Sequence, residues 1–142
     1  MEYDVVDKAE QVIIDLNEKG YIDKEKKVKD KFGKFIPKLT NSQIRKFLTA
    51  VNIVKNKVDV FVAKNNGADS LSYELVAEVK FLKVNILYQA AKDNTGAVKN
   101  FVMASNVDKF INDIGNDVNK FNKFCKYVEA LVAFHKFYGG RD

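Results

Sequence analysis

A chain of 142 residues with 46% hydrophobic and 30% charged residues has the size and composition of one globular domain. It has no apolar run of membrane-spanning length, and its acidic, periodic N-terminus is not typical of a signal peptide. The single cysteine, Cys125, excludes an internal disulfide and any site built from several cysteines, which fits a reducing compartment. We therefore expect one cytoplasmic domain spanning residues 1–142.

The net charge of +5 is unevenly distributed along the chain. Residues 1–18 carry six acidic residues and one lysine, whereas residues 19–64 carry thirteen basic residues against four acidic ones. Residues 65–142 are nearly balanced, with ten basic residues against nine acidic ones. Such a concentration of positive charge is typical of a surface that binds a polyanion. A lysine-rich surface that serves only solubility gives the same pattern, so charge alone leaves both interpretations open.

Hydrophobic residues recur at helical spacing along most of the chain and predict an all-α fold, a compact bundle of five to six helices. The first helix is expected at about Val5–Glu18, because Gly20 stands just beyond its apolar stripe. Lysines crowd the next segment, residues 20–38, which also holds Gly33 and Pro37. We expect this segment to be a mobile basic loop, with room for a short helical turn.

The second helix has the strongest start signal in the sequence. Thr40 is a favourable N-cap and Gln43 completes a capping box, while Leu39 and Ile44 are placed for a hydrophobic staple. We expect the helix to end at residues 65–67. Its apolar stripe is Ile44, Phe47, Leu48, Val51, Val54, Val58 and Phe61. A polar strip runs beside that stripe: Arg45, Thr49, Asn52 and Asn56.

The third helix should begin after Ser72, continue to about Asp93 and be apolar on two sides. One face is Leu75, Val79, Leu82 and Ile86; the other is Ala77, Phe81, Val84 and Tyr88. A helix with two apolar faces is central to a bundle or shared with another subunit, and both interpretations stay open. Short helices should follow at about 97–104 and, capped by Asn106, at about 107–114, before a last helix at about 117–138.

Side chains that could catalyse a reaction or hold a metal are not grouped in the sequence. His135 and Cys125 share an apolar helix face but stand about 15 Å apart along it, too far for a nucleophile–base pair. A single histidine also excludes a histidine-based zinc triad. No glycine-rich phosphate loop is present, and the acidic residues are scattered. We therefore expect no enzymatic activity, no metal and no cofactor.

Binding of a polyanion remains as a function. Lysine and arginine neutralise phosphates independently of sequence, and the resulting affinity falls steeply with salt. Arg45 and Arg141 are the only arginines among 24 basic residues, and an arginine fork suits phosphate better than a lysine does. The neutral residues beside Arg45, Asn52 among them, could bond to phosphate or 2′-hydroxyl groups. We expect contacts with the nucleic-acid backbone rather than readout of bases.

Three segments together resemble the small subunit of the type III-A CRISPR (Csm) effector complex. They are LTNSQIRKFLTAVN at 39–52, ELVAEVKFLKVNILYQAAKDN at 74–94 and FCKYVEALVAFHKFYGGRD at 124–142, of which the closing FHKFYGG is the most specific. The resemblance implies a helical bundle in several copies, which form a minor filament beside the backbone subunits that hold the guide RNA. It also implies a non-catalytic subunit whose basic face lines the channel of the guide–target RNA duplex.

The partners that the resemblance implies are guide RNA and target RNA, the backbone and large Csm subunits, and neighbouring copies of the chain, with no membrane; the implied role is antiviral defence. Its basic positions, carried over one by one, are Arg45, Lys46, Lys80, Lys83, Lys92, Lys126, Lys136 and Arg141. Asn52 joins them from the polar strip. The family often has arginine at the positions of Lys92 and Lys126. Lysine keeps the positive charge there but cannot form the bidentate contact that an arginine makes with a phosphate. The alternative is a stand-alone helical DNA-binding regulator, although the best basic helix follows a long loop rather than a short turn.

Overall fold

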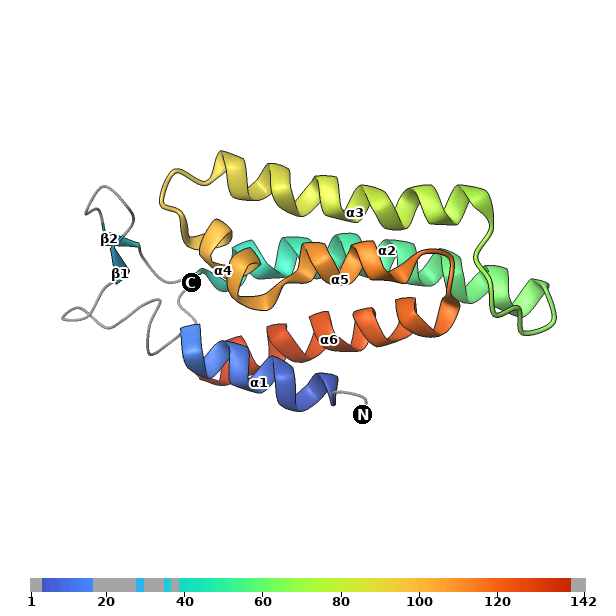
Figure 1. Ribbon diagram of the computed structural model, residues 1–142, viewed down its shortest axis with the longest axis horizontal. Coiled ribbons are helices and arrows are strands. Elements are labelled where there is room, and N and C mark those ends of the chain that lie inside the picture. The colour runs from blue at the N-terminus through green and yellow to red at the C-terminus, as the bar shows by residue number, and fades with distance from the viewer. Residues whose placement is uncertain (1–3, 17–27, 30–34, 37–38, 139–142) are drawn as a thin grey trace.

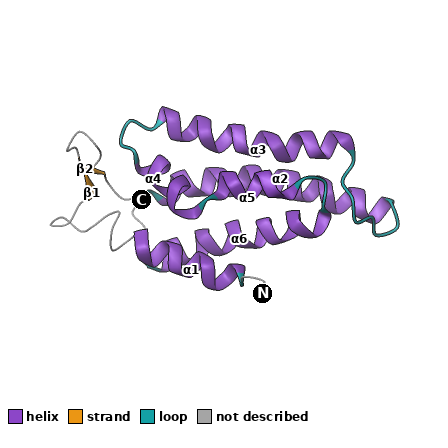
Figure 2. Cartoon of the chain, viewed as in Figure 1, coloured by secondary structure: helices purple, strands orange, loops and turns teal. Residues whose placement is uncertain are grey.

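The computed structural model describes residues 4–16, 28–29, 35–36 and 39–138. These residues form six α-helices and one pair of very short strands (Figure 1, Figure 2). The helices are α1 (Val5–Asp15), α2 (Asn41–Lys64), α3 (Tyr73–Lys92), α4 (Ala97–Ser105), α5 (Val107–Ile114) and α6 (Val118–Phe137). The prediction of an all-α bundle of five to six helices is confirmed for the described part of the chain.

The helices pack in three tiers (Figure 1). Helix α6 packs against α1, α2 and α5, whereas α3 packs against α2, α4 and α5. Helices α3 and α6 therefore lie on opposite sides of the bundle, with α2, α4 and α5 between them (Figure 1). Of the two interpretations of the third helix, a central position is wrong, because α3 lies at the edge of the bundle and its second apolar face is exposed.

The core consists of the apolar stripes that the helical spacing predicts. Helix α6 contributes three of the four largest fully buried side chains, and the fourth, Phe47 of α2, meets Phe124 of α6 edge to face, with 6.4 Å between the ring centroids. The single cysteine and the single histidine of the chain are buried in this core, since Cys125 is 4% exposed and His135 is 2% exposed. Many of the eleven phenylalanines and six tyrosines of the chain thus serve the packing of the core.

Local signals set the helix boundaries. The backbone N–H of Gln43 donates to Thr40 Oγ1 at 3.0 Å, and the backbone N–H of Thr40 donates to Gln43 Oε1 at 2.9 Å, which is the predicted capping box. One predicted cap is wrong: Asn106 makes no side-chain capping bond. Its backbone has a φ of 57°, and it is the single residue that joins α4 to α5.

The described part of the basic segment is extended rather than helical. Strands β1 (Val28–Lys29) and β2 (Phe35–Ile36) pair antiparallel, with Val28 opposite Ile36 and Lys29 opposite Phe35. The short helical turn that the sequence left room for is therefore not found in these four residues. The expected mobile loop lies mostly outside the described residues. Among the described helices, none is long and apolar enough to cross a membrane.

Candidate nucleic-acid interface

The structure describes eight of the nine residues predicted to bind RNA, and Arg141 lies outside the described residues. Seven of the eight are exposed and Lys83 is half-buried. They come from three helices and fall into separate groups. Helix α2 carries Arg45, Lys46 and Asn52; helix α3 carries Lys80, Lys83 and Lys92; helix α6 carries Lys126 and Lys136.

Lys46 and Lys92 line the same hollow, although 46 residues separate them in the sequence. This basic hollow encloses about 330 Å³ between the first turns of α2 and the last turns of α3. Its walls also carry Asn85 and Tyr88. Neither lysine forms an ion pair with any residue that the structure describes, so both ammonium charges face solvent. Two cations that converge from different helices are suited to an anionic ligand.

One hydrogen bond and one cation–π contact fix the walls of the basic hollow. The side-chain amide of Gln89 donates to the backbone carbonyl of Gln43 at 2.7 Å and ties the end of α3 to the start of α2. The ammonium nitrogen of Lys92 lies 5.4 Å from the centroid of the Tyr88 ring, within range of a cation–π contact. The contacts that shape the hollow thus pair neither of its lysines with a carboxylate.

Asp93 is the acidic residue of the basic hollow, but its carboxylate bonds to the start of α4. One oxygen accepts from the backbone N–H of Val98 at 2.9 Å, and the other accepts from the Thr95 hydroxyl at 2.7 Å and its N–H at 3.1 Å. Burial works to raise the pKa of Asp93, but these hydrogen bonds outweigh it and lower the pKa. The charge of Asp93 therefore faces the positive end of α4 rather than the two lysines.

Lys80 and Lys83 line a second, separate hollow of about 200 Å³ between α3 and α5. The ammonium group of Lys83 donates to the side-chain carbonyl of Asn112 at 2.9 Å. Lys83 and Lys92 are two and a half helical turns apart, so they leave α3 on opposite sides. The predicted lysines of α3 consequently form two patches rather than one.

The remaining predicted residues lie on the outer surfaces of α2 and α6. Arg45 adjoins Lys46 in the second turn of α2. The Nε2 of His135 donates to the carbonyl of Leu39 at 2.8 Å, which places the last turn of α6, with Lys136, at the same end of the bundle. Asn52 lies two turns further along α2, and Lys126 lies in the middle of α6. Arg45, Lys46, Lys92 and Lys136 therefore lie at the same end of the bundle, with Lys92 and Lys136 on helices from its opposite sides.

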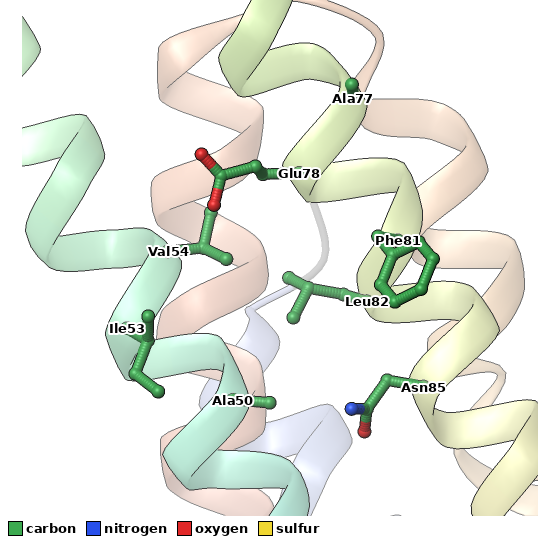
Figure 3. A pocket seen from close by; sticks show the side chains of 8 residues that line it. All are labelled: Ala50, Ile53, Val54, Ala77, Glu78, Phe81, Leu82 and Asn85. Carbon is green, nitrogen blue, oxygen red and sulfur yellow. The ribbon is translucent and has the colours of Figure 1, made fainter.

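An apolar hollow of about 390 Å³ adjoins the basic hollow between α2 and α3 (Figure 3). Ala50, Ile53 and Val54 form one wall, and Phe81 and Leu82 stand on the other. Sequence reasoning placed Phe81 and Tyr88 on an apolar face but assigned neither to a binding site, nor did it single out Asn85. The seven-residue spacing of Phe81 and Tyr88 was the signal, because it puts both rings on one side of α3.

The residues considered for catalysis do not form a site. Cys125 and His135 are both buried, and burial raises the pKa of the Cys125 thiol to about 12, which keeps it protonated. Among the described residues, no three histidine, cysteine, aspartate or glutamate side chains lie close enough together to hold a metal ion.

Sequence comparison relates the chain to CRISPR proteins. A model of the family described as Csm2 Type III-A matches residues 21–141. A protein named CRISPR system Cms protein Csm2 from Streptococcus thermophilus is 33% identical over 132 residues, which cover 89% of this chain and 98% of the relative. Its namesake from Enterococcus italicus is 34% identical over 133 residues, 89% of this chain and 90% of the relative. A further relative of that name, from Mycobacterium tuberculosis, is 28% identical over 104 residues, 73% of this chain and 78% of the relative. The resemblance drawn from the three sequence segments is thereby confirmed: the chain belongs to the Csm2 family of type III-A CRISPR systems.

Proposed function

We propose that this chain is a non-catalytic small subunit of a cytoplasmic type III-A CRISPR effector complex and that it binds RNA at the end of the bundle where Arg45, Lys46, Lys92 and Lys136 lie. One observation carries the RNA-binding part: Lys46 and Lys92 converge on one hollow without a carboxylate partner among the described residues. In this proposal the ligands are the backbones of guide RNA and target RNA, and the role is antiviral defence.

The charge of this surface supports contact with phosphate rather than with a protein carboxylate alone. Lysine contacts to phosphate release counterions, and each such contact contributes to the salt dependence of binding. Lys92 stands in the last turn of α3 and Lys136 in the last turn of α6, where the helix dipole stabilises a cation. Each cation is thus favourably placed in the free protein and remains available to a ligand.

The proposed protein partners are the backbone and large Csm subunits and neighbouring copies of the chain, which together form a minor filament. The outer face of α3 supports such contacts, because Tyr73 and Val84 are both more than half exposed there. Large apolar side chains that remain exposed in one chain are typical of interaction surfaces. Burial of His135 and Cys125 in the core supports the absence of a catalytic role.

The experiment is a salt series on the complete chain and on the complex purified from its host. Binding to single-stranded RNA, an RNA duplex and double-stranded DNA is measured for the wild type, Lys46→Ala and Lys64→Ala. Lys64 is a matched control, because it is exposed on the same side of α2 about five turns further along. We expect Lys46→Ala to reduce the slope of log K against log salt by about 0.7 to 0.9, the value for one phosphate contact.

Three outcomes would count against the proposal. Tight, sequence-specific binding to double-stranded DNA would favour the DNA-binding regulator instead. An equal effect of Lys46→Ala and Lys64→Ala would remove the basic hollow as the binding surface. Purification of the chain from its host without RNA or other Csm subunits would contradict the assignment to an effector complex.

A further inference from the structure

The basic hollow and the apolar hollow between α2 and α3 meet at Asn85, which lines both, and together they form one furrow. Lys46 and Lys92 belong to its basic half. Ile53 and Phe81 belong to its apolar half, which Figure 3 shows. A nucleotide combines the same two kinds of chemistry, an anionic phosphate and a flat apolar base. The furrow therefore offers more than a backbone contact.

Two aromatic rings stand open to a ligand along the furrow. Phe81 is 64% exposed and Tyr88 is 65% exposed. The bundle does not need these rings for its core, because Val79 and Ile86 on the other side of α3 are buried and fill it. Exposed aromatic side chains beside lysines form the stacking surfaces on which proteins hold bases of single strands.

The polar groups around Tyr88 are also available. No described residue bonds to the side-chain amide of Asn85, so it can pair with the edge of a base. Lys46 and Lys92 line the hollow without an ion-pair partner among the described residues, and the carboxylate of Asp93 is engaged by the start of α4. Glu78, which lines the apolar hollow, is paired with Lys57 at 2.8 Å. The charges of the furrow that have no charged partner among the described residues are therefore those of the two lysines, which favours an anionic ligand.

The spacing of the rings favours a single strand over a duplex. Phe81 and Tyr88 are seven residues apart, about 10 Å along α3. Bases that stack on one another within a strand are separated by about 3.4 Å, so the two rings cannot meet neighbouring bases that remain stacked. A duplex also hides the faces of its bases and leaves only phosphates and groove edges for contact.

We propose that the furrow binds an unstacked nucleotide of single-stranded RNA, with the base against the ring of Tyr88, the Asn85 amide at the base edge, and the phosphates at Lys46 and Lys92. This inference rests on the proposed RNA binding and deepens it. It adds a contact with the base, where the sequence led us to expect contact with the backbone alone.

The test compares two RNA probes with the complete chain, by fluorescence anisotropy at low salt. One probe is octaadenylate, and the other is an octamer with the same phosphates whose central positions lack bases. Tyr88→Ala should weaken binding of octaadenylate about tenfold and leave binding of the abasic strand unchanged, because one base–aromatic stack is lost. Tyr88→Phe keeps the ring and should bind octaadenylate as the wild type does. Tyr73→Ala is the matched control, since Tyr73 is an exposed tyrosine of α3 outside the furrow.

The Lys46→Ala variant separates this inference from the proposed function. Lys46→Ala should weaken both probes to the same extent, because both carry the phosphates. If Lys46→Ala acts in this way but Tyr88→Ala binds octaadenylate like the wild type, the base contact is refuted and RNA binding stands. Equal affinity of the wild-type chain for both probes, or no binding of either, refutes the base contact as well. Loss of the other Csm subunits from the Tyr88→Ala complex with RNA affinity intact would identify the furrow as a protein contact instead.

Discussion

Tyr127 is buried in the middle of the bundle and joins three helices through its hydroxyl group and its ring. Tyr127 of α6 has no exposed surface, and its hydroxyl donates to the backbone carbonyl of Ser105 at 2.8 Å. Ser105 ends α4, where helix carbonyls have no partner within the helix. The ring of Tyr127 stacks on Phe110 of α5, with 5.1 Å between the centroids. Removal of the hydroxyl alone therefore isolates one hydrogen bond.

We expect Tyr127→Phe to lower the free energy of unfolding by about 1–2 kcal/mol. The ring stays in place, so neither apolar burial nor the stack on Phe110 changes. The loss is that of one buried hydrogen bond, with an added cost because the Ser105 carbonyl stays unpaired away from water. For a domain of this size, a loss of 1 kcal/mol lowers the melting temperature by about 3–4 °C.

Urea unfolding followed by circular dichroism measures this loss, and the m-value should stay unchanged because the exposed surface is the same. Tyr88→Phe is the matched control, since the Tyr88 side chain is 65% exposed and removal of its hydroxyl should leave stability within about 0.5 kcal/mol. A Tyr127→Phe variant as stable as the wild type would mean that the Ser105 carbonyl gains a new partner, and the assigned role of the hydroxyl would be wrong.

Three further predictions concern charge. Burial raises the pKa of the Cys125 thiol from 9.0 to about 12, so its contribution to stability is present below pH 9 and lost as pH rises toward 12. In Cys125→Ala, the midpoint of urea unfolding should therefore fall less between pH 9 and pH 11 than it does in the wild type. Despite its partial burial, Asp93 has a lowered pKa because of its hydrogen bonds, so its contribution is present above about pH 4 and lost in acid. Asp93→Ala should cost about 1 kcal/mol at pH 7 and less at pH 3, by thermal unfolding. The bridge between Lys57 and Glu78, 2.8 Å long, is largely exposed, so Lys57→Ala should change the free energy of unfolding by less than about 1 kcal/mol in urea.

The helices could be predicted from the sequence because their signals are local. Thr40 and Gln43 are three residues apart and bond to each other as predicted, and Ser72 accepts from the backbone N–H of Leu75 as an N-cap should. Asn106 shows the limit of such reasoning. An asparagine at a helix start also favours the left-handed conformation, and here the single-residue junction between α4 and α5 requires that conformation instead of a side-chain cap.

The candidate site could be predicted only in part. Its residue types follow from charge and from the family resemblance, but their grouping depends on contacts between distant segments. The bond from Gln89 to Gln43 spans 46 residues and that from His135 to Leu39 spans 96. Helical spacing shows that Lys83 and Lys92 leave α3 on opposite sides, yet it cannot say which side faces α2.

The residues that hold the fold and those proposed to bind RNA are almost completely separate in this chain. Lys46, Asn85 and Tyr88 are exposed, so their substitution removes little buried surface and leaves the core stripes of α2 and α3 intact. Gln89 is the exception, because its bond to Gln43 sets the spacing of the two helices at the basic hollow. A Gln89 variant should therefore weaken RNA binding and stability together, whereas a Tyr88 variant should change binding alone. If Tyr88→Ala also lowered stability, the ring would belong to the fold, and its exposure would no longer support a binding role.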